Sequence, residues 1–364
     1  MALSEIIIEK IKNDGPIPFH DFMDMALYYP DLGYYTSTRN KIGAEGDFYT
    51  SSCLTPVFGA LIGKQIEEMW RLLGEGPFTI VEYGAGTGML CHDILEYCKN
   101  IPRLYEQLNY CIIEKSPAMR QREKIHLNEK VCWHDSIKEL GKVKGCILSN
   151  ELLDNIPVHQ VVMDGVLKEV FIDHDKNMLV ETLRPAGEWL TTYLTELAVQ
   201  LPDGFRTEIN LGAVHWLEEI AGCLDEGFVI TVDYGHESAE LYRDCRRNGT
   251  LMCYHKHSVN DNVLDNPGTQ DITSHVNFSA LRLWGEKFGL QCCGLTTQAA
   301  FLLSLGLAEK LYASLHEEGK SIENLKKHAF LKHTLLFDMG QKFKVLIQQK
   351  GTQKKTLAGL RFTH

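Results

Sequence analysis

The segment FTIVEYGAGTGML, residues 78–90, constrains the fold of this chain more than any other stretch. Its continuous apolar run predicts an inner parallel strand that ends at Glu82, and the residues from Met89 to Cys98 predict a helix. Between them, glycines occur at alternate positions: Gly84, Gly86 and Gly88. Glycine permits positive φ and lets a ligand approach the backbone without meeting a Cβ, while the helix directs its first N–H groups to the same place. The sequence therefore predicts a nucleotide-like ligand on this turn.

The spacing of the glycines indicates which ligand is bound. Dinucleotide sites usually carry GxGxxG, in which the third glycine packs a helix against a strand. Here the pattern is E-x-G-x-G-x-G, with Glu82 two residues before the first glycine. This form resembles the first motif of the class I S-adenosylmethionine (SAM) methyltransferases, and Glu82 can help to hold the turn and the positive charge of the ligand. A purely structural turn and an NAD site remain alternatives, because glycine fingerprints alone are weak evidence.

Acidic and polar residues after the next two predicted strands extend this site. Glu114 ends the strand NYCIIE, roughly one βαβ unit after the glycines, where a carboxylate can accept hydrogen bonds from both ribose hydroxyls. Asp135 and Ser136 follow the short strand KVCWHD, where adenine-contacting groups lie in methyltransferases. Competing interpretations make Glu114 a solvated acid at a strand end and Asp135 the N-cap of the following helix.

The composition of the chain narrows the class of protein. The chain has 364 residues and a net charge of −11, which argues against binding of nucleic acid or anionic membranes, because both need clustered Lys and Arg. It is compatible with a protein substrate that carries an arginine. The 11 cysteines include no C-x-x-C pair, and those in apolar contexts are typical of a reducing compartment. We see no secretory signal or membrane span and expect no membrane insertion.

Hydrophobic periodicity predicts an α/β fold, a Rossmann-like doubly wound sheet with added segments. We expect residues 1–76 to form an N-terminal helical cap and residues 77–364 to form the core. Insertions are expected at about 155–210, beginning with β-hairpins, and at about 299–341, where the pattern is helical.

Residues 227–233 are the predicted fifth strand. We expect a long loop region to follow it and to extend to Val276. The last two strands, Leu290–Gln298 and Phe343–Gln348, should then form an antiparallel hairpin. This hairpin would complete a seven-stranded sheet.

The segment NELLDNIP, residues 150–157, follows the fourth predicted strand at the edge where doubly wound sheets place their active sites. Glu151 and Asp154 are three residues apart, so on a helical turn they would share a face. Two carboxylates placed in this way could clamp a guanidinium through paired N–H bonds and aim one nitrogen at the methyl group of SAM. The alternative is a capping acid beside a solvated acid.

Three potential metal ligands, Cys253, His255 and His257, alternate along one extended segment and would share a face. A metal site is one interpretation. No fourth ligand has diagnostic spacing, however, and exposed histidines in strands are commoner than metal sites. We therefore expect no metal, and the sequence assigns no role to these three residues.

The order and spacing of several motifs resemble those of a known family. The motifs extend through nearly the whole chain: LYYPDLGYY, IGAEGDFYTSS, VEYGAGTG, IIEKS, SNELLDNIPVHQ, VDYGH, NPGTQDITSHVNF and TQAAFLLSLG. Together they resemble the MidA family of SAM-dependent methyltransferases, whose mitochondrial members act as complex I assembly factors. The resemblance implies a class I methyltransferase fold, SAM as the cofactor and, for the mitochondrial members, ω-N-methylation of protein arginine. Carried over by motif, it implies a SAM-binding set and an acceptor-side set: Gly84, Gly86 and Glu114, and Asn150, Glu151 and Asp154.

The leading hypothesis from the sequence is a protein arginine methyltransferase. Its alternatives are a methyltransferase for a small molecule or another side chain, a SAM-binding assembly chaperone with little turnover, and an NAD oxidoreductase. Glu151 and Asp154 favour a cationic acceptor over the chaperone, and the glycine spacing disfavours NAD. A bacterial cytoplasm is the expected location, with mitochondria as the alternative if a presequence is missing from this chain. A homodimer is compatible with the sequence, which does not name the acceptor protein.

Overall fold

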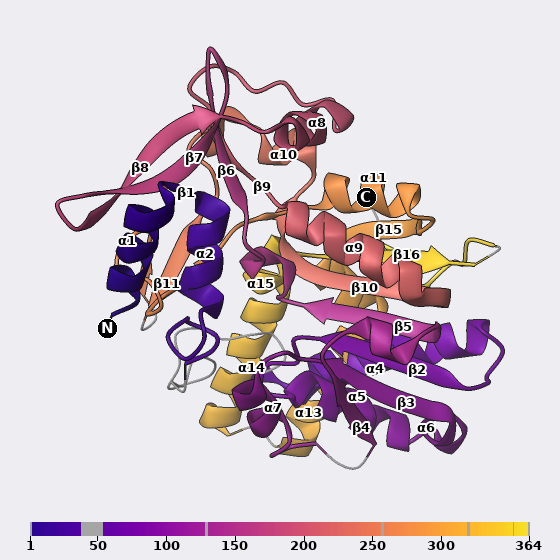
Figure 1. Ribbon diagram of the computed structural model, residues 1–364. Coiled ribbons are helices and arrows are strands. Elements are labelled where there is room, and N and C mark those ends of the chain that lie inside the picture. The colour runs from indigo at the N-terminus through magenta and orange to yellow at the C-terminus, as the bar shows by residue number, and fades with distance from the viewer. Residues whose placement is uncertain are drawn as a thin grey trace. The chain divides into compact units, whose positions relative to one another are not determined.

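The computed structural model describes residues 2–37, 54–127, 130–255, 258–318, 321–351 and 353–362 (Figure 1). The chain forms two compact units, each assembled from segments that are distant in the sequence. Unit 1 comprises Met1–Phe48, Leu153–Trp216 and Gly235–Leu283. Unit 2 comprises Tyr49–Leu152, Leu217–Tyr234 and Trp284–His364. Each unit has a hydrophobic core of its own.

Unit 2 is built on a sheet with the strand order β15-β16-β10-β5-β2-β3-β4 (Figure 1). The strand bounds are β2 Phe78–Tyr83, β3 Leu108–Ile113, β4 Val131–His134, β5 Val143–Asn150, β10 Leu224–His236, β15 Gln291–Thr297 and β16 Phe343–Lys350. Strands β10, β5, β2, β3 and β4 are parallel, whereas β16 is antiparallel to both β10 and β15. The predicted doubly wound sheet with an antiparallel final hairpin is therefore confirmed.

Several helices of unit 2 connect or flank these strands. They are α4 Pro56–Leu72, α5 Met89–Lys99, α6 Pro102–Gln107, α7 Pro117–Glu123, α12 Gln298–Ser304, α13 Leu307–Glu318, α14 Ile322–Leu336 and α15 Met339–Lys342. Helix α4 approaches α5 closely, because a Cβ on Gly59 would lie 2.4 Å from the Cβ of Asp93. The expected helical insertion before the last strand is confirmed, but short breaks divide it into four helices.

Unit 1 contains a β sheet with two helices packed on it. Its strands are β1 Ile17–Pro18, β6 His159–Asp164, β7 Val166–Asp175, β8 Met178–Pro185 and β9 Arg206–Ile209, in the order β1-β7-β6-β9 with β8 paired to β7. Helices α1, Leu3–Asp14, and α2, Phe19–Tyr28, contact this sheet. The antiparallel hairpins predicted after the fourth strand are confirmed. Strand β1, which lies about 150 residues earlier in the chain, joins this sheet by pairing Ile17 with Ile172 of β7.

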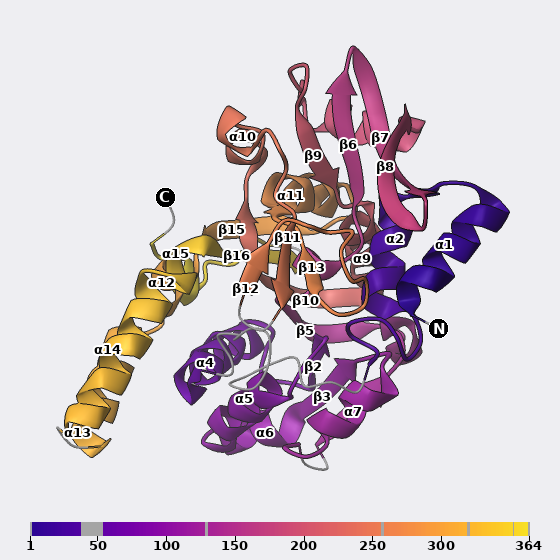
Figure 2. The ribbon, with the colours of Figure 1, turned by 90° about the vertical axis from the view of Figure 1, so that its left-hand side faces the viewer.

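A second, small sheet of unit 1 corrects the prediction of a long loop that extends to Val276. Its strands are β11 Met252–His255, β12 Ser258–Asn260 and β13 Asp271–Thr273, with β11 in the middle (Figure 2). Strands of three or four residues leave too short an alternating pattern to separate them from loop. The remaining helices associated with this unit are α8 Glu188–Glu196, α9 Leu211–Cys223, which continues into unit 2, α10 Ser238–Leu241 and α11 Phe278–Lys287.

The residues expected to form one N-terminal cap, 1–76, are divided between the two units. Helices α1 and α2 belong to unit 1, whereas α4 belongs to unit 2. Compact units defined by their contacts need not be independently folding domains, so the expected domain boundary after residue 76 stays a prediction. The same holds for the limits of the insertions. Within the described ranges, no helix is both long enough and apolar enough to cross a membrane.

Candidate functional site

The glycine turn after β2 adopts the backbone conformation that the sequence predicts. The φ angles are 63° at Gly84, 61° at Gly86 and 79° at Gly88, all in the left-handed region that favours glycine. Strand β2 extends one residue beyond Glu82, and Gly88 is the N-cap of α5. Gly88 has no side chain, so the N-cap residue itself offers no acceptor to the first N–H groups of this helix. N–H groups at a helix N-terminus can bind anionic ligand groups.

Gly84 and Gly88 also let neighbouring segments of the chain approach the turn closely. A Cβ on Gly84 would lie 3.2 Å from Cδ1 of Leu152, which follows β5. A Cβ on Gly88 would lie 3.3 Å from Cα of Glu123, at the end of α7. The turn is thus in contact with the loop after β5 on one side and with α7 on the other. Gly88 is required for helix packing whether or not it touches the cofactor.

Glu82 lies inside the sheet and is only 2% exposed. The hydroxyl of Tyr110, on the neighbouring strand β3, donates a 2.6 Å hydrogen bond to its Oε2. Burial raises the pKa of Glu82 to about 7, although this hydrogen bond opposes the shift. The structure therefore has Glu82 supporting the turn from within the sheet, and its direct contact with SAM stays a prediction.

Glu114 directly follows β3, at the same edge of the sheet as the glycine turn. Its backbone N–H donates to the carbonyl of His134 in β4, and its Oε1 accepts a 2.6 Å hydrogen bond from the N–H of Ser116. Burial raises the pKa of Glu114, while the Ser116 N–H and the charge of Arg120 oppose the shift. A carboxylate oriented in this way beside the glycine turn fits the predicted ribose-binding role, which stays a prediction.

Asp135 and Ser136 differ in their surroundings. Arg120 donates from Nε to the Glu114 carbonyl at 2.6 Å and from a terminal nitrogen to Oδ1 of Asp135 at 2.5 Å. The side chain of Asp135 is nevertheless 74% exposed. Ser136, rather than Asp135, is the N-cap of the short 3₁₀ helix Ile137–Leu140, and Glu139 completes a capping box with it. The capping interpretation therefore belongs to Ser136, and adenine contact by either residue stays a prediction.

Glu123 is a buried carboxyl group of this region that sequence reasoning missed. Its side chain is fully buried, and the indole N–H of Trp133 donates to its Oε2 at 2.7 Å. Burial, together with the charges of Glu114 and Glu82, raises the pKa of Glu123 to about 8, although the hydrogen bond from Trp133 opposes the shift. Nothing in the local sequence distinguishes this glutamate from the solvated charges of an ordinary helix. In the folded chain it lies where the end of α7 approaches Gly88.

The loop after β5 brings candidate acceptor-side residues to the same sheet edge. Glu151 has a φ of 53°, and its N–H donates to the carbonyl of Val232 in β10 at 3.0 Å. The side-chain amide of Asn150 donates a hydrogen bond to Oε1 of Glu151 at 3.2 Å. Asp233, also in β10 and almost fully buried, accepts a hydrogen bond from the N–H of Leu152 at 3.3 Å. A non-glycine residue held in the left-handed region between two strands is compatible with the acceptor-side role expected for Glu151, which stays a prediction.

Asp154 does not share a helical face with Glu151, and that expectation is wrong. The helical turn includes only Leu153–Asn155, while Glu151 precedes it in the left-handed conformation. The chain passes from unit 2 to unit 1 between Leu152 and Leu153. Asp154 is 5% exposed and lies within unit 1. Asp154 thus lies on the helical turn, whereas Glu151 lies before it in the left-handed conformation. Their joint action on an acceptor stays a prediction.

The three alternating potential metal ligands are only partly described. Cys253 is buried in β11, and Nδ1 of His255 hydrogen-bonds with the carbonyl of Thr269 at 2.8 Å. His257 lies outside the described residues. Among the residues that are described, no three His, Cys, Asp or Glu side chains are grouped to hold a metal ion.

The residues around the glycine turn fit SAM by their chemistry. SAM carries an ammonium, a sulfonium and a carboxylate, so its net charge is positive. Burial raises the pKa values of the carboxyl groups Glu82, Glu114 and Glu123, because it disfavours their negative form. A cationic ligand nearby would favour that form, and the start of α5 would accept the carboxylate of the ligand.

Comparison with known proteins shows the family to which the region around the glycine turn belongs. Residues 61–296 match the model of a family described as S-adenosyl-L-methionine-dependent methyltransferases. Two curated relatives are the protein arginine methyltransferase NDUFAF7 homolog, mitochondrial, of Drosophila melanogaster and the protein arginine methyltransferase NDUFAF7, mitochondrial, of Xenopus tropicalis. The first is 27% identical over 98% of this chain and 84% of its own length. The second is 28% identical over 94% of this chain and 84% of its own length.

A solved structure shows the same fold with a product of SAM chemistry bound. It is a COG1565 superfamily member from Burkholderia thailandensis in complex with S-adenosyl-homocysteine. It superposes with a TM-score of 0.89 at 27% identity, covering 99% of this chain and 95% of its own. The expected MidA-like class I methyltransferase fold and the expected cofactor, SAM, are therefore confirmed.

Proposed function

Because the chain belongs to the family of S-adenosyl-L-methionine-dependent methyltransferases, we propose that it transfers the methyl group of SAM to an arginine side chain of a protein. The names of the curated relatives, all protein arginine methyltransferases, support this acceptor. The acidic net charge of the chain, −11, supports a cationic substrate.

The observation that carries the proposal is the conformation of Glu151. Its left-handed backbone is held by the Val232 carbonyl, and the next residue, Leu152, contacts Gly84 in the glycine turn. A carboxylate is thereby carried on a defined loop beside the residues proposed to hold SAM. An anionic side chain at this place suits a guanidinium, which presents its N–H donors in a fork that matches a carboxylate.

The proposed chemistry needs little from the protein beyond orientation and charge. Bound SAM supplies an electrophilic methyl group on a sulfonium that is already a good leaving group. A guanidinium nitrogen forms the new N–C bond as the C–S bond breaks, and the electron pair of that bond goes to sulfur. Glu151, with Asp154 and Asn150, is proposed to hold the other guanidinium nitrogens and to accept the released proton. Glu114 and the start of α5 would hold the cofactor, with Glu82 supporting the turn.

Methylation with labelled SAM tests this function. The purified protein is incubated with methyl-tritiated SAM and a protein extract from source cells that lack it, and labelled proteins are digested and sequenced by mass spectrometry. Label on ω-nitrogens of arginine is the expected result. Label confined to small molecules or to other side chains would replace arginine with those acceptors. Absence of any label, with SAM bound normally, would favour the assembly chaperone with little turnover.

The location and assembly state belong to the proposal as well. The curated relatives are described as mitochondrial, whereas the solved structure is of a bacterial protein. A bacterial cytoplasm is the location proposed for this chain, and fractionation of the source cells tests it. A homodimer is proposed alongside, and light scattering across a dilution series tests whether the mass is that of one chain or two.

A further inference from the structure

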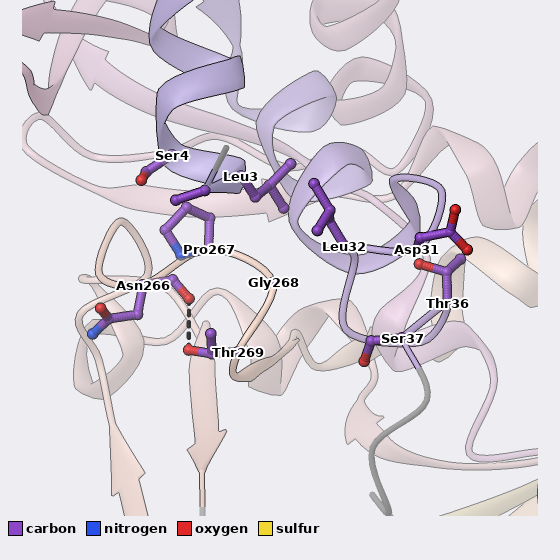
Figure 3. Close-up of a pocket in the computed structure, with 11 residues that line it drawn as sticks. Leu3, Ser4, Asp31, Leu32, Thr36, Ser37, Asn266, Pro267, Gly268 and Thr269 are labelled. Atoms are coloured by element: carbon purple, nitrogen blue, oxygen red, sulfur yellow. Dashed lines mark hydrogen bonds between the residues drawn. The ribbon is translucent and has the colours of Figure 1, made fainter.

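Two motif segments without a place in the cofactor site lie together in unit 1: residues 28–35, from LYYPDLGYY, and residues 266–275, from NPGTQDITSH. Gly268, with a φ of 83°, approaches so closely that a Cβ there would lie 2.3 Å from the carbonyl oxygen of Leu32. Both segments, with the start of α1, line a cavity of about 440 Å³ (Figure 3). The two motifs are thus parts of one structure.

Tyr35 is placed by the turn that follows α2. The N–H groups of Tyr34 and Tyr35 donate to the carbonyls of Ala26 and Leu27 at 2.9 and 2.8 Å, so the chain folds back on the end of the helix. Gly33 permits this close approach, because a Cβ there would lie 2.5 Å from the backbone nitrogen of Tyr29. The ring of Tyr35 stacks on that of Tyr28, with centroids 5.6 Å apart. The position of the Tyr35 hydroxyl is therefore defined by backbone and by ring packing.

The Tyr35 hydroxyl connects the two motifs to the turn that carries Asp154. It donates to Oδ2 of Asp271 at 2.9 Å and accepts from the side-chain amide of Asn155 at 3.2 Å. Desolvation, followed by the charge of Asp271, raises the pKa of Tyr35 well above its usual value, so the hydroxyl keeps its proton. Tyr28 donates to Oδ1 of the same Asn155 at 2.9 Å.

All three carbonyls of the turn Leu153–Asn155 accept hydrogen bonds from other segments of unit 1. The Leu153 carbonyl accepts from the side chain of Asn210 at 2.9 Å, and the Asp154 carbonyl accepts from the N–H of Ser274 at 2.8 Å. The Asn155 carbonyl lies 3.1 Å from the hydroxyl of Tyr28 and shares its single proton with Oδ1 of the same residue. A 3₁₀ turn of three residues has poor hydrogen-bond geometry of its own, so these outside bonds determine its orientation.

We propose that Tyr35 is a positioning residue for methyl transfer, which orients Asp154 by holding the neighbouring Asn155 against Asp271. This inference rests on the proposed function, in which Asp154 faces the acceptor. A displacement of about 1 Å at a substrate-positioning group can lower a rate roughly 100-fold, so the loss of one hydroxyl that anchors the turn should be measurable. SAM is held by residues of unit 2 in this account, and its binding should be insensitive to Tyr35.

The test compares Tyr35→Phe with Tyr29→Phe in the full-length protein. Among the described residues, no hydrogen bond of the Tyr29 hydroxyl is found, so this change is the matched control in the same segment. The readouts are the single-turnover rate with methyl-tritiated SAM and the extract described above, SAM affinity by calorimetry, and the thermal midpoint. We expect Tyr35→Phe to lower the rate about 5- to 20-fold, the scale of one lost hydrogen bond in the transition state, with SAM affinity and midpoint close to wild type. Tyr29→Phe should leave all three unchanged.

A double-mutant cycle with Asn155→Ala separates positioning from a general loss of structure. If Tyr35 acts through Asn155, the double variant should be no slower than the slower single variant. Rate losses that multiply, or a Tyr35→Phe rate equal to that of Tyr29→Phe, would overturn the inference. Tyr28→Phe, which removes a different bond to Asn155, replaces Tyr35→Phe in the cycle if that variant does not fold.

Asp154→Asn distinguishes failure of this inference from failure of the proposed function. A large rate loss in Asp154→Asn with a wild-type rate in Tyr35→Phe would overturn the positioning role alone. A wild-type rate in Asp154→Asn would remove Asp154 from the acceptor side and overturn both.

Discussion

Two turns at the carboxyl edge of one sheet both contain residues in the left-handed backbone conformation, but the residue types differ. After β2, the left-handed positions are occupied by glycines, with φ angles of 63°, 61° and 79°. After β5, the left-handed position is occupied by Glu151, with a φ of 53°. Glycine adopts this conformation freely, whereas other residues lose about 1–2 kcal/mol. The difference is what we expect if the first turn leaves space for a ligand and the second presents a side chain, the roles that we propose for them.

The largest effect is expected where a side chain is forced into the glycine turn. Gly86→Val should lower SAM affinity by at least about 100-fold, because a β-branched residue resists a φ of 61° and would add a side chain where we propose that SAM binds. Calorimetry measures the affinity, and circular dichroism checks that the fold is kept. The control is Gly76→Val, also in unit 2, where no atom lies within 4 Å of an added Cβ. An unchanged affinity in Gly86→Val would place SAM elsewhere.

The free energy of unfolding should depend on pH because of Glu123, which lies beside Gly88 of the glycine turn. Burial raises the pKa of Glu123 to about 8, so the folded protein favours its neutral form. This contribution to stability is fully present below the pKa of the unfolded chain, about 4.5, and is lost as the pH rises through about 8. Between pH 5 and 9, wild type should lose on the order of a few kcal/mol relative to Glu123→Gln.

Denaturant unfolding at each pH, without SAM, measures this difference. Glu139→Gln is the control, because hydrogen bonding to His134 lowers the pKa of Glu139 from its ordinary value of 4.5, so the midpoint of its titration lies below this range. A constant difference between wild type and Glu123→Gln from pH 5 to pH 9 would show that Glu123 is already ionised in the folded protein.

Glu114 should matter for SAM affinity more than for folding. Glu114→Ala should weaken SAM binding by about 1–3 kcal/mol, the scale of lost charge-assisted hydrogen bonds, and Glu114→Asp should weaken it less. Calorimetry gives the affinities, with the thermal midpoint recorded beside them because the Ser116 N–H loses its acceptor in the alanine variant. Wild-type affinity in both variants would make Glu114 a supporting residue of the loop.

The smallest effect is a stabilisation that bears directly on the comparison of the two turns. Glu151→Gly should raise the free energy of unfolding by up to about 1 kcal/mol, because glycine relieves the left-handed strain. Glu75→Gly is a matched control, since Glu75 has a φ of 58° in the same unit and forms an exposed ion pair with Arg103. Both variants should be stabilised, but only Glu151→Gly should lose methyl transfer. A loss of stability in Glu151→Gly alone would mean that its side chain supports the fold.

The sequence predicts the first turn well and the second poorly, for physical reasons. Left-handed glycines leave a local pattern, and so do the buried strands on either side of them. The conformation of Glu151 depends on Val232 and Asp233, about 80 positions later, which no local pattern reveals. The expectation of a helical face shared with Asp154 failed because spacing alone does not specify a helix.

Residues joined only in the folded chain account for the rest of what was missed. Tyr35 and Asp271 are 236 positions apart, and neither is adjacent to a residue that chemistry would single out. Glu123 is buried where the end of α7 approaches Gly88, a contact between residues 35 positions apart. The main strands and helices, by contrast, could be predicted because each carries a clear periodicity.

We propose that the loop after β5 carries the group that promotes methyl transfer while the glycine turn binds the cofactor. Glu151→Gln separates these two roles, because the change keeps the shape of the side chain and removes its charge. The measurement is the single-turnover rate of arginine methylation with labelled SAM, made beside calorimetry on the same variant. We expect a rate at least about 100-fold lower with SAM affinity within about twofold of wild type, the signature of lost transition-state stabilisation. A wild-type rate of methylation in Glu151→Gln would contradict it.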